Sequence, residues 1–233
     1  MKIFHAQQKM VWENEHKNPC QLTSVAGVGV SGGVREFWKY FRSVVKADDV
    51  IGLEIGCGKG RNVIWLATQG ANMEGFDFSH SAIEVAKKKV RGKLKKRAHF
   101  FEHDIIKTWP FQKDYFDFAI DCFVSTDVEG VRNRKFMIEE AYRVLKPGGY
   151  FFLYTNSVKS DFYKYMVTRC KVDEVNAFCY PDIKKFEKVY TQKELDKLYG
   201  CFKLKESKVF KRNSFVDNKP VCWEHIWRVY QKK

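Results

Sequence analysis

The chain has 233 residues, 45% of them hydrophobic and 16% aromatic, which is enough apolar mass for the core of one folded domain. This aromatic content excludes a disordered chain, and no run of about 18 apolar residues is present that could form a membrane span. The first eight residues lack the apolar core of a secretory signal. We therefore expect a soluble, single-domain, cytoplasmic protein without a membrane partner.

The charge is strongly basic. A formal net charge of +14 results from 42 lysines and arginines against 28 aspartates and glutamates, which favours nucleic acid or other anionic partners. The basic residues are densest over 87–97, a run without a single acid that is typical of a helix end and the following turn. At this point both a solvated face and an RNA or DNA contact surface are open for that run.

Residues 1–46 are polar at first and then helix-like, and we expect them to form an N-terminal cap segment of the domain. Within them, Phe37, Trp38, Phe41 and Val45 are spaced to form one apolar helix face. This face predicts a helix that packs on the core.

From residue 50 onward, short apolar runs alternate with amphipathic segments. Predicted strands cover residues 50–55, 71–76, 116–123 and 150–154. Predicted helices cover residues 63–68 and a segment that starts at Ser81 with capping-box spacing. A third predicted helix carries Met137, Ala141, Val144 and Leu145 on one face and is stopped by Pro147. Such alternation requires crossover connections and hence a mainly parallel sheet covered on both faces. The ligand crevice of such a sheet lies beyond the carboxyl ends of its strands.

The last third of the chain has a different pattern. Residues 158–190 are rich in aromatics without clean periodicity, which is typical either of an apolar lid or of a packed helical insertion. A second capping box at Thr191 predicts a helix that runs to Gly200. Predicted strands at 202–210 and 223–230, with a polar turn near Asn213 and Asn218, would form an antiparallel hairpin at one edge of the sheet.

Three glycines stand at alternate positions directly after the first predicted strand. Gly56, Gly58 and Gly60 permit positive φ and let a ligand approach the backbone. The dinucleotide fingerprint needs glycine at the sixth position of this loop, where the chain has Arg61. Glu54 would repel a pyrophosphate and suits a cationic group such as the ammonium of an amino acid.

Two further acids follow later strands. Asp77 ends the next predicted strand, about 20 residues after the first glycine, the spacing at which a carboxylate meets a ribose diol in nucleotide-binding sheets. Asp104 precedes a turn and is placed to accept a hydrogen bond from an exocyclic amine. The sequence therefore presents acids for an ammonium, a diol and an aminopurine at successive strand ends.

Four motifs in this order closely resemble the class I S-adenosylmethionine-dependent methyltransferases: Glu54-x-Gly56-x-Gly58-x-Gly60, then residues 75–79 (GFDFS), 116–121 (FDFAID) and 143–149 (RVLKPGG). The likeness covers roughly residues 35–157 and continues more weakly over 191–230. It implies a three-layer, doubly wound α/β fold with a mainly parallel seven-stranded sheet and an antiparallel C-terminal strand. It also implies that residues 158–190 are an insertion that covers the acceptor site.

The resemblance implies S-adenosylmethionine as the cofactor and assigns its contacts to residues at the strand ends: Glu54, Gly56, Cys57, Gly58, Gly60, Asp77, Phe78, Asp104, Ile105 and Asp121. Glu54 and the glycine loop would hold the methionine portion. Asp77 would bind the ribose hydroxyls, with Phe78 against the adenine face. Asp104 and the backbone of Ile105 would meet the adenine edge, and Asp121 would lie near the methionine amino group and the sulfonium.

The sequence says much less about the methyl acceptor than about the cofactor. The family usually walls this site with an N-terminal segment, the loop after the fourth strand and an insertion after the fifth, here residues 10–13, 125–130 and 155–190. The Asp/Asn-Pro-Pro-aromatic tetrapeptide common in enzymes that methylate base amino groups is absent, because residues 121–124 read DCFV. Cys122 has no recognisable partner base for nucleophilic catalysis. His103 and Asp121 are the candidate catalytic residues.

Three hypotheses stay open at this point: a methyltransferase for a small-molecule acceptor, an RNA methyltransferase acting on a cap, tRNA or rRNA through the surface around 87–97, and a catalytically silent binding protein. The small-molecule enzyme is the expectation, and the intact glycines and ligand acids weigh against the silent protein. The seven cysteines are scattered without a C-x-x-C pair, and no His/Asp/Glu grouping has metal-site spacing, so we expect reduced thiols and no metal. No feature predicts an oligomeric state.

Overall fold

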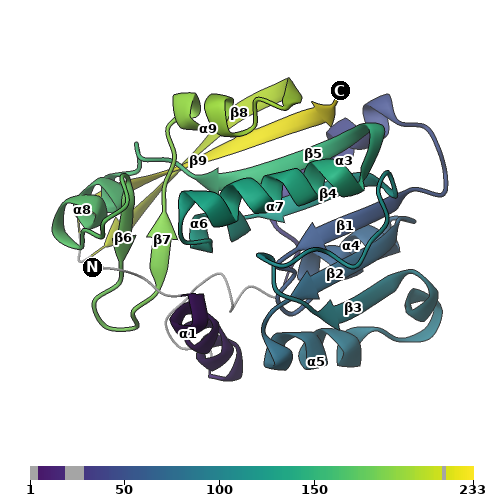
Figure 1. The fold of residues 1–233 in the computed structure, drawn as a ribbon, viewed down its shortest axis with the longest axis horizontal. Helices are drawn as coiled ribbons and strands as arrows, with labels where there is room; N and C mark the ends of the chain where they lie inside the picture. Colours follow the sequence, from purple (N-terminus) through teal and green to yellow (C-terminus); the bar gives the residue numbers. More distant parts are fainter. Residues whose placement is uncertain (1–4, 19–28, 217–218) are drawn as a thin grey trace.

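The computed structural model describes residues 5–18, 29–216 and 219–233. Its main sheet has seven strands in the order β3-β2-β1-β4-β5-β9-β8 (Figure 1). The strands are β1 (Ile51–Ile55), β2 (Asn72–Asp77), β3 (Ala98–Glu102), β4 (Phe116–Cys122), β5 (Leu145–Asn156), β8 (Phe202–Val216) and β9 (Lys219–Lys232). Neighbours among β1–β5 are parallel, whereas β9 runs antiparallel to both β5 and β8. This confirms the predicted sheet and its antiparallel edge.

Helices cover both faces of the sheet. The helices of the described residues are α1 (His5–Lys17), α3 (Gly32–Val44), α4 (Arg61–Thr68), α5 (His80–Lys89), α6 (Val124–Asp127), α7 (Val131–Val144), α8 (Asp161–Arg169) and α9 (Gln192–Leu198), with a 3-10 turn at Gly92–Lys96. Buried side chains of α3, α4 and α5 form one core with the sheet, and those of α7 and α9 form a second core on the opposite face. The three-layer prediction is therefore confirmed, and parallel strands are buried on both faces as such sheets require.

The first core centres on aromatic rings of α3. Phe37 stacks on Phe152 with ring centroids 4.9 Å apart, and Phe41 meets Phe118 at 4.8 Å. The predicted apolar face is thus confirmed for Phe37, Trp38 and Phe41, which are buried. Val45 lies just beyond the last helical residue and is only partly buried.

Two predicted helix boundaries are wrong. α5 is capped by Ser79, whose side chain accepts a hydrogen bond from the backbone of Ala82, so the capping box predicted at Ser81 does not form. The Ser81 hydroxyl instead donates to Glu13 of α1 at 2.5 Å. α7 ends at Val144, and Leu145 begins β5 beside β4 rather than closing the helix.

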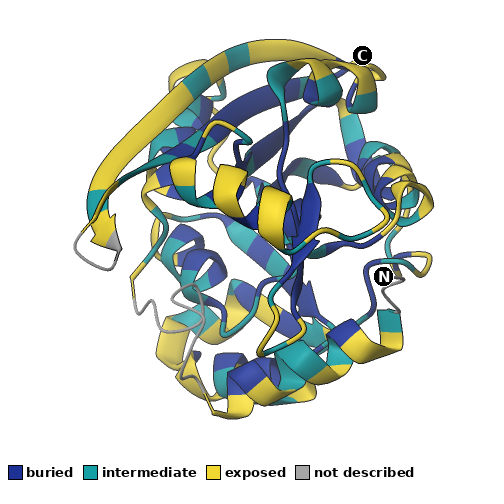
Figure 2. Ribbon diagram, turned by 90° about the vertical axis from the view of Figure 1, so that its left-hand side faces the viewer, coloured by how far each residue is buried: buried dark blue, intermediate teal, exposed yellow. Residues whose placement is uncertain are grey.

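The C-terminal hairpin is longer than predicted. Asn213 lies within β8 opposite Cys222, so it is not part of the turn, and Asn218 lies outside the described residues. Most residues of β8 are exposed, as expected for an edge strand, and Figure 2 shows a long exposed ribbon there. The second capping box is present at Thr191, and its helix ends at Leu198 rather than Gly200.

Residues 158–190, the predicted insertion, form a compact segment between β5 and α9. It contains α8 and a small antiparallel sheet of β6 (Ala177–Cys179) and β7 (Phe186–Lys188). Tyr163, Met166 and Phe178 pack with Val189 into a core of their own. Within the described ranges, no helix is long and apolar enough to cross a membrane.

Candidate active site

A cavity lies at the carboxyl ends of β1, β2 and β4, with α1 along its other side. In Figure 1, α1 stands beyond the arrowheads of the central strands. The predicted residues Glu54, Gly56, Cys57, Gly58, Asp77, Phe78 and Ile105 border this cavity. Parallel strands place their carboxyl ends at one edge, which brings together residues that are far apart in the sequence.

The glycine loop has a backbone that other residues adopt only with strain. Gly56 has φ +56°, and a Cβ there would come within 2.5 Å of the Val124 side chain. Gly60 has φ +75°, and its Cβ would meet the Phe100 ring at 2.6 Å. Both positions therefore require glycine for conformation and for space. Gly60 supports the loop from behind and does not line the cavity.

Asp77 holds this loop in place. Its Oδ2 accepts the backbone N–H of Gly58 and its Oδ1 that of Ser79, each at 2.9 Å. Burial raises the pKa of the carboxyl to about 6 although these N–H groups favour the charged form. The side chain thus borders the cavity while it ties the ends of β1 and β2 together.

Glu54 presents an unsatisfied oxygen at the cavity. Its Oε1 accepts a hydrogen bond from Asn62 at 2.6 Å, while Oε2 is buried without a hydrogen-bond partner among the described residues. Burial raises the pKa of this carboxyl to about 8. A buried carboxylate oxygen without a donor is costly, so a ligand that brings an ammonium group suits this position.

Two predicted residues, Asp104 and Asp121, have other immediate partners. Asp104 does not line the cavity, because His5 of α1 lies between them and its Nε2 is 2.9 Å from both carboxylate oxygens. Asp121 is fully buried behind the wall, where its Oδ1 accepts the backbone N–H of Val124 at 2.8 Å and thereby holds the start of α6. His103 borders the cavity, and its Nε2 is buried without a partner in the described part of the chain.

Cys122 also borders the cavity. Burial raises the pKa of its thiol to about 12, so the group stays protonated at neutral pH. This weighs further against a covalent role. Among residues 5–18, 29–216 and 219–233, no group of three or more His, Cys, Asp or Glu side chains is arranged to hold a metal ion.

A family model described as a methyltransferase domain matches residues 53–153, which carry the glycine loop and the acids at the strand ends. Over these residues the chain is similar to the class I S-adenosylmethionine-dependent methyltransferases. Members of this family use S-adenosylmethionine as the methyl donor. The free oxygen of Glu54 and the open glycine loop fit the amino-acid portion of that molecule.

Individual proteins are similar to this chain in sequence or in fold. Demethylmenaquinone methyltransferase of Lactobacillus johnsonii is 32% identical over 134 residues, which is 55% of this chain and about half, 52%, of that relative. A methyltransferase from Methanosarcina mazei shares the fold, with a TM-score of 0.72 and 24% identity over 83% of this chain and 96% of its own. The 1,6-didemethyltoxoflavin-N1-methyltransferase of Burkholderia thailandensis matches with a TM-score of 0.67 and 12% identity, over 98% of this chain and 88% of its own.

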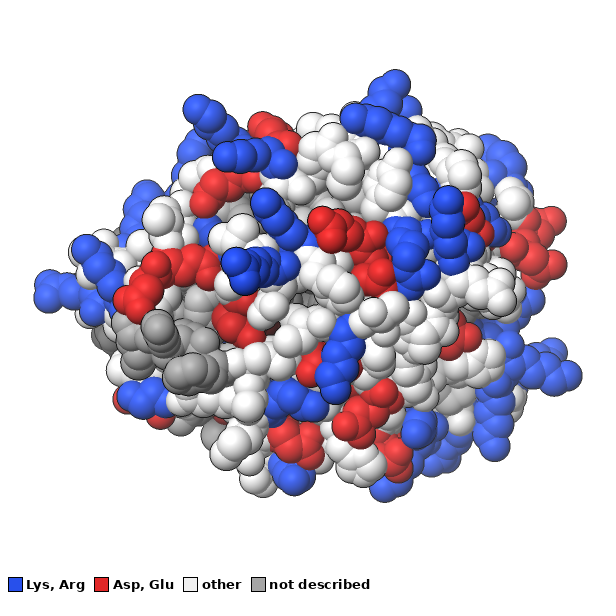
Figure 3. Space-filling view, in the orientation of Figure 1, with Lys and Arg blue, Asp and Glu red and all other residues white. Residues whose placement is uncertain are grey.

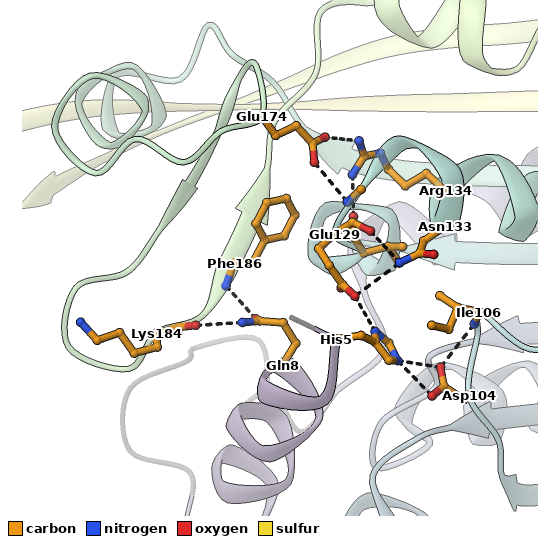
Figure 4. A network of polar contacts seen from close by, with 12 residues as sticks. His5, Gln8, Asp104, Ile106, Glu129, Asn133, Arg134, Glu174, Lys184 and Phe186 are labelled. Atoms are coloured by element: carbon orange, nitrogen blue, oxygen red, sulfur yellow. Dashed lines mark hydrogen bonds and ion pairs between the residues drawn. The ribbon is translucent and has the colours of Figure 1, made fainter. Parts of the chain in front are cut away.

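In this structure, α1 connects the sheet to residues 158–190 (Figure 4). His5 Nδ1 is 2.7 Å from Glu129, and its other nitrogen contacts Asp104. Gln8 donates to the carbonyl of Lys184 at 3.0 Å and accepts the N–H of Phe186 at 2.8 Å. Sequence patterns gave no sign of these contacts, because each joins residues that are about 100 or more positions apart.

The contact of His5 with two carboxylates predicts a pH-sensitive attachment of α1. Burial lowers the pKa of His5, but hydrogen bonds to Asp104 and Glu129 outweigh it and raise the pKa to about 9. The contact therefore stabilises docking fully below about pH 6.5 and loses this effect as pH rises through about 9. We expect His5→Ala to speed amide hydrogen exchange in α1 at least about tenfold at pH 7, and the unaltered protein to approach that rate above pH 9 after correction for intrinsic exchange.

The control is His80→Ala, which removes an exposed histidine paired with Glu102 at 3.2 Å. This variant should leave exchange in α1 unchanged. Equal protection of α1 in His5→Ala and His80→Ala would contradict the predicted attachment.

Proposed function

We propose that this protein transfers the methyl group of S-adenosylmethionine to a small organic acceptor. The observation that carries the proposal is the Glu54 oxygen without a partner, placed beside a glycine loop that Asp77 holds open. The similarity to the methyltransferase domain indicates the donor. Since the curated relatives are matched over only about half of their length, the acceptor is inferred from the site.

Different residues at the cavity would bind different parts of the donor. Glu54 would accept hydrogen bonds from the ammonium of the donor, and Asp77 from its ribose hydroxyls. Phe78 and Ile105 offer apolar surface to the adenine ring. The bound donor supplies an electrophilic methyl group, so the protein has mainly to align the acceptor and exclude water. α1 and the insertion are the elements placed to do so.

The shape of the cavity supports a small acceptor. α1 lines one side of it, and Gln8 joins α1 to β7 of the insertion, which leaves a covered site rather than an open groove. Two of the matched relatives are named for small acceptors, demethylmenaquinone and 1,6-didemethyltoxoflavin. An apolar ring system with a polar reacting atom would suit the mixed walls of Trp12, Phe123 and Asp127.

None of residues 87–97 lines this cavity, although Lys89 Nζ donates to the carbonyl of the cavity-lining Lys59 at 3.1 Å. Arg97, at the end of this basic run, bonds the carbonyl of Gly70 and pairs with Asp49, and both precede strands at the amino-terminal edge of the sheet. On the face in Figure 3, lysines and arginines are spread over the outline with acids between them. Both observations favour a solvated surface over an RNA footprint.

The function is tested first by calorimetry with S-adenosylmethionine and its demethylated product, and then by transfer of a labelled methyl group to a panel of naphthoquinols, phenols and heteroaromatic amines. We expect binding of both cofactor forms and labelling of at least one panel member. If neither cofactor form binds, the proposal fails. If transfer occurs only to RNA, and RNA affinity falls steeply with added salt, the RNA methyltransferase replaces the small-molecule enzyme.

A further inference from the structure

Asp127 is the last residue of α6 and borders the cavity. The first residue of this helix, Val124, lies against the glycine loop, because a Cβ on Gly56 would come within 2.5 Å of it. Asp127 follows three residues later, which places it about 4.5 Å further along the axis and near the same helix face. The carboxylate therefore lies about one helical turn beyond the loop that we assign to the methionine portion of the donor.

Asp127 belongs to an ionic cluster with two residues of the insertion. Its Oδ1 is 3.1 Å from the ammonium of Lys185, which is 3.2 Å from Glu187. The side chain of Asp127 is 19% exposed, against 8% for Lys185 and 3% for Glu187. Glu187 is held further by Asn156, which donates to its Oε1 at 2.5 Å. Of the two carboxylates, Asp127 is thus the one that opens to the cavity.

The cluster has two carboxylates for one ammonium, so it gains a neutral total charge when it takes up one proton. A net charge in a buried environment is costly, which favours that uptake. Burial and the negative charges of Glu187 and Asp121 raise the pKa of Asp127 to about 7, against the opposing effect of Lys185. A carboxylate that exchanges a proton near neutral pH is suited to general base catalysis.

Most other ionisable groups at the cavity have partners or lie at the part assigned to the donor. His16 of α1 also lines the cavity, with Nδ1 unpartnered among the described residues, but it lies against the glycine loop, 3.4 Å from where a Cβ on Gly58 would lie, and burial lowers its pKa to about 4. Glu129 is bound through Oε1 to His5 and Asn133, while its Oε2 is buried without a partner among the described residues. Glu54 and Asp77 lie at the part of the cavity assigned to the donor. His103 packs edge-on against Phe76 at 5.5 Å, at the end of the cavity assigned to the adenine. Asp127 borders the cavity together with Trp12, whose ring centroid lies 4.9 Å from the same Lys185 ammonium, and this is the part where we expect the acceptor.

We propose that Asp127 is the general base of this methyltransferase and that the acceptor is methylated on a hydroxyl oxygen or an N–H nitrogen. Asp127 takes the proton of that O–H or N–H bond, and the electron pair of the bond stays on the acceptor atom. The acceptor atom forms the new bond to the methyl carbon while the pair of the carbon–sulfur bond leaves with sulfur. Lys185 is a positioning residue, because it orients Asp127 and limits its proton affinity. This inference rests on the proposed function.

The test uses sinefungin, an analogue of S-adenosylmethionine that carries an amine where the donor has its methyl-bearing sulfonium. A carboxylate next to the reacting methyl position should bind this amine. We expect the unaltered protein to bind sinefungin at least about tenfold more tightly than S-adenosylhomocysteine at pH 8, measured by calorimetry. Asp127→Asn should abolish this preference and leave the affinity for S-adenosylhomocysteine unchanged, which also shows that the variant is folded.

The pH profile separates a base from a structural carboxylate. The preference for sinefungin should disappear as pH falls below about 7, where Asp127 becomes protonated. Lys185→Met should shift this loss to higher pH, since removing the ammonium raises the pKa of Asp127 further. The matched control is Asp114→Asn, which removes another aspartate that is paired with a lysine. Asp114 lies just before β4, away from the cavity, and is 2.6 Å from Lys232 of β9.

The outcomes are distinct. An unchanged preference in Asp127→Asn, or no preference in the unaltered protein, would overturn the assignment of Asp127 while the proposed function stands. Failure of both ligands to bind the unaltered protein would refute the proposed function, and the assignment with it. Equal loss of preference in Asp114→Asn would show a general charge effect and would likewise overturn the assignment.

Discussion

Asp77→Ala is expected to weaken the binding of S-adenosylhomocysteine about 100-fold, which corresponds to about 3 kcal/mol. The carboxylate accepts the backbone N–H groups of Gly58 and Ser79, so its loss removes the expected ribose contact and also releases the glycine loop. Calorimetry at pH 8 checks this result, since the pKa of Asp77 is raised to about 6 by burial and the group is ionised there.

Two further variants complete this experiment. Asp77→Asn keeps the size and one acceptor oxygen, but its amide nitrogen cannot accept from a backbone N–H, so we expect an intermediate loss. Asp49→Ala, at an exposed carboxylate before β1, should bind the ligand like the unaltered protein. An affinity of Asp77→Ala equal to that of Asp49→Ala would remove the ribose assignment.

Phe118→Ala is expected to lower the free energy of unfolding by about 3–5 kcal/mol, a large share of the 5–15 kcal/mol typical of folded domains. Phe118 is fully buried in β4 and meets Phe37 and Phe41 at 5.7 and 4.8 Å between ring centroids. Its ring fills the space that a side chain on Gly52 would take, because a Cβ there would come within 2.2 Å of it. Denaturant unfolding followed by fluorescence and circular dichroism measures the change.

Phe215→Ala is the matched control, because this ring is 75% exposed near the end of β8. Its removal should change the free energy of unfolding by less than about 0.5 kcal/mol. A loss below about 1 kcal/mol for Phe118→Ala would mean that the neighbouring rings move into the space left by the removed ring. That result would contradict the close packing of this aromatic core.

The fold was predictable from the sequence because its information is local. Alternating apolar runs and amphipathic segments define strands and helices one at a time, and crossover connections leave few ways to assemble them. The errors fall where two local signals compete. Ser79 and Ser81 both offer a hydroxyl at the start of α5, and only the contact of Ser81 with Glu13 shows which one caps the helix.

The predicted strand ends were sufficient to locate Glu54 and Asp77 at the cavity, because the last residues of all parallel strands lie at the same edge of the sheet. The position of a residue at a strand end did not predict the direction in which its side chain points. Asp121 also ends a strand, yet its carboxylate points to the backbone of Val124, where the first turn of α6 needs an acceptor. Asp104 is occupied by His5, a residue 99 positions away.

Local pattern thus sufficed for most strands and helices of the sheet and for the edge at which the acids gather, because periodicity and turn chemistry act between near neighbours along the chain. It did not predict β3, and the seven-stranded sheet was expected from the family resemblance. Long-range packing was needed to show which carboxylates face the cavity, that α1 covers it through His5 and Gln8, and that Asp127 meets Lys185 of the insertion. The physical reason is that burial and charge pairing depend on groups brought together only when the chain is folded. The same packing that buries Asp127 sets its affinity for a proton.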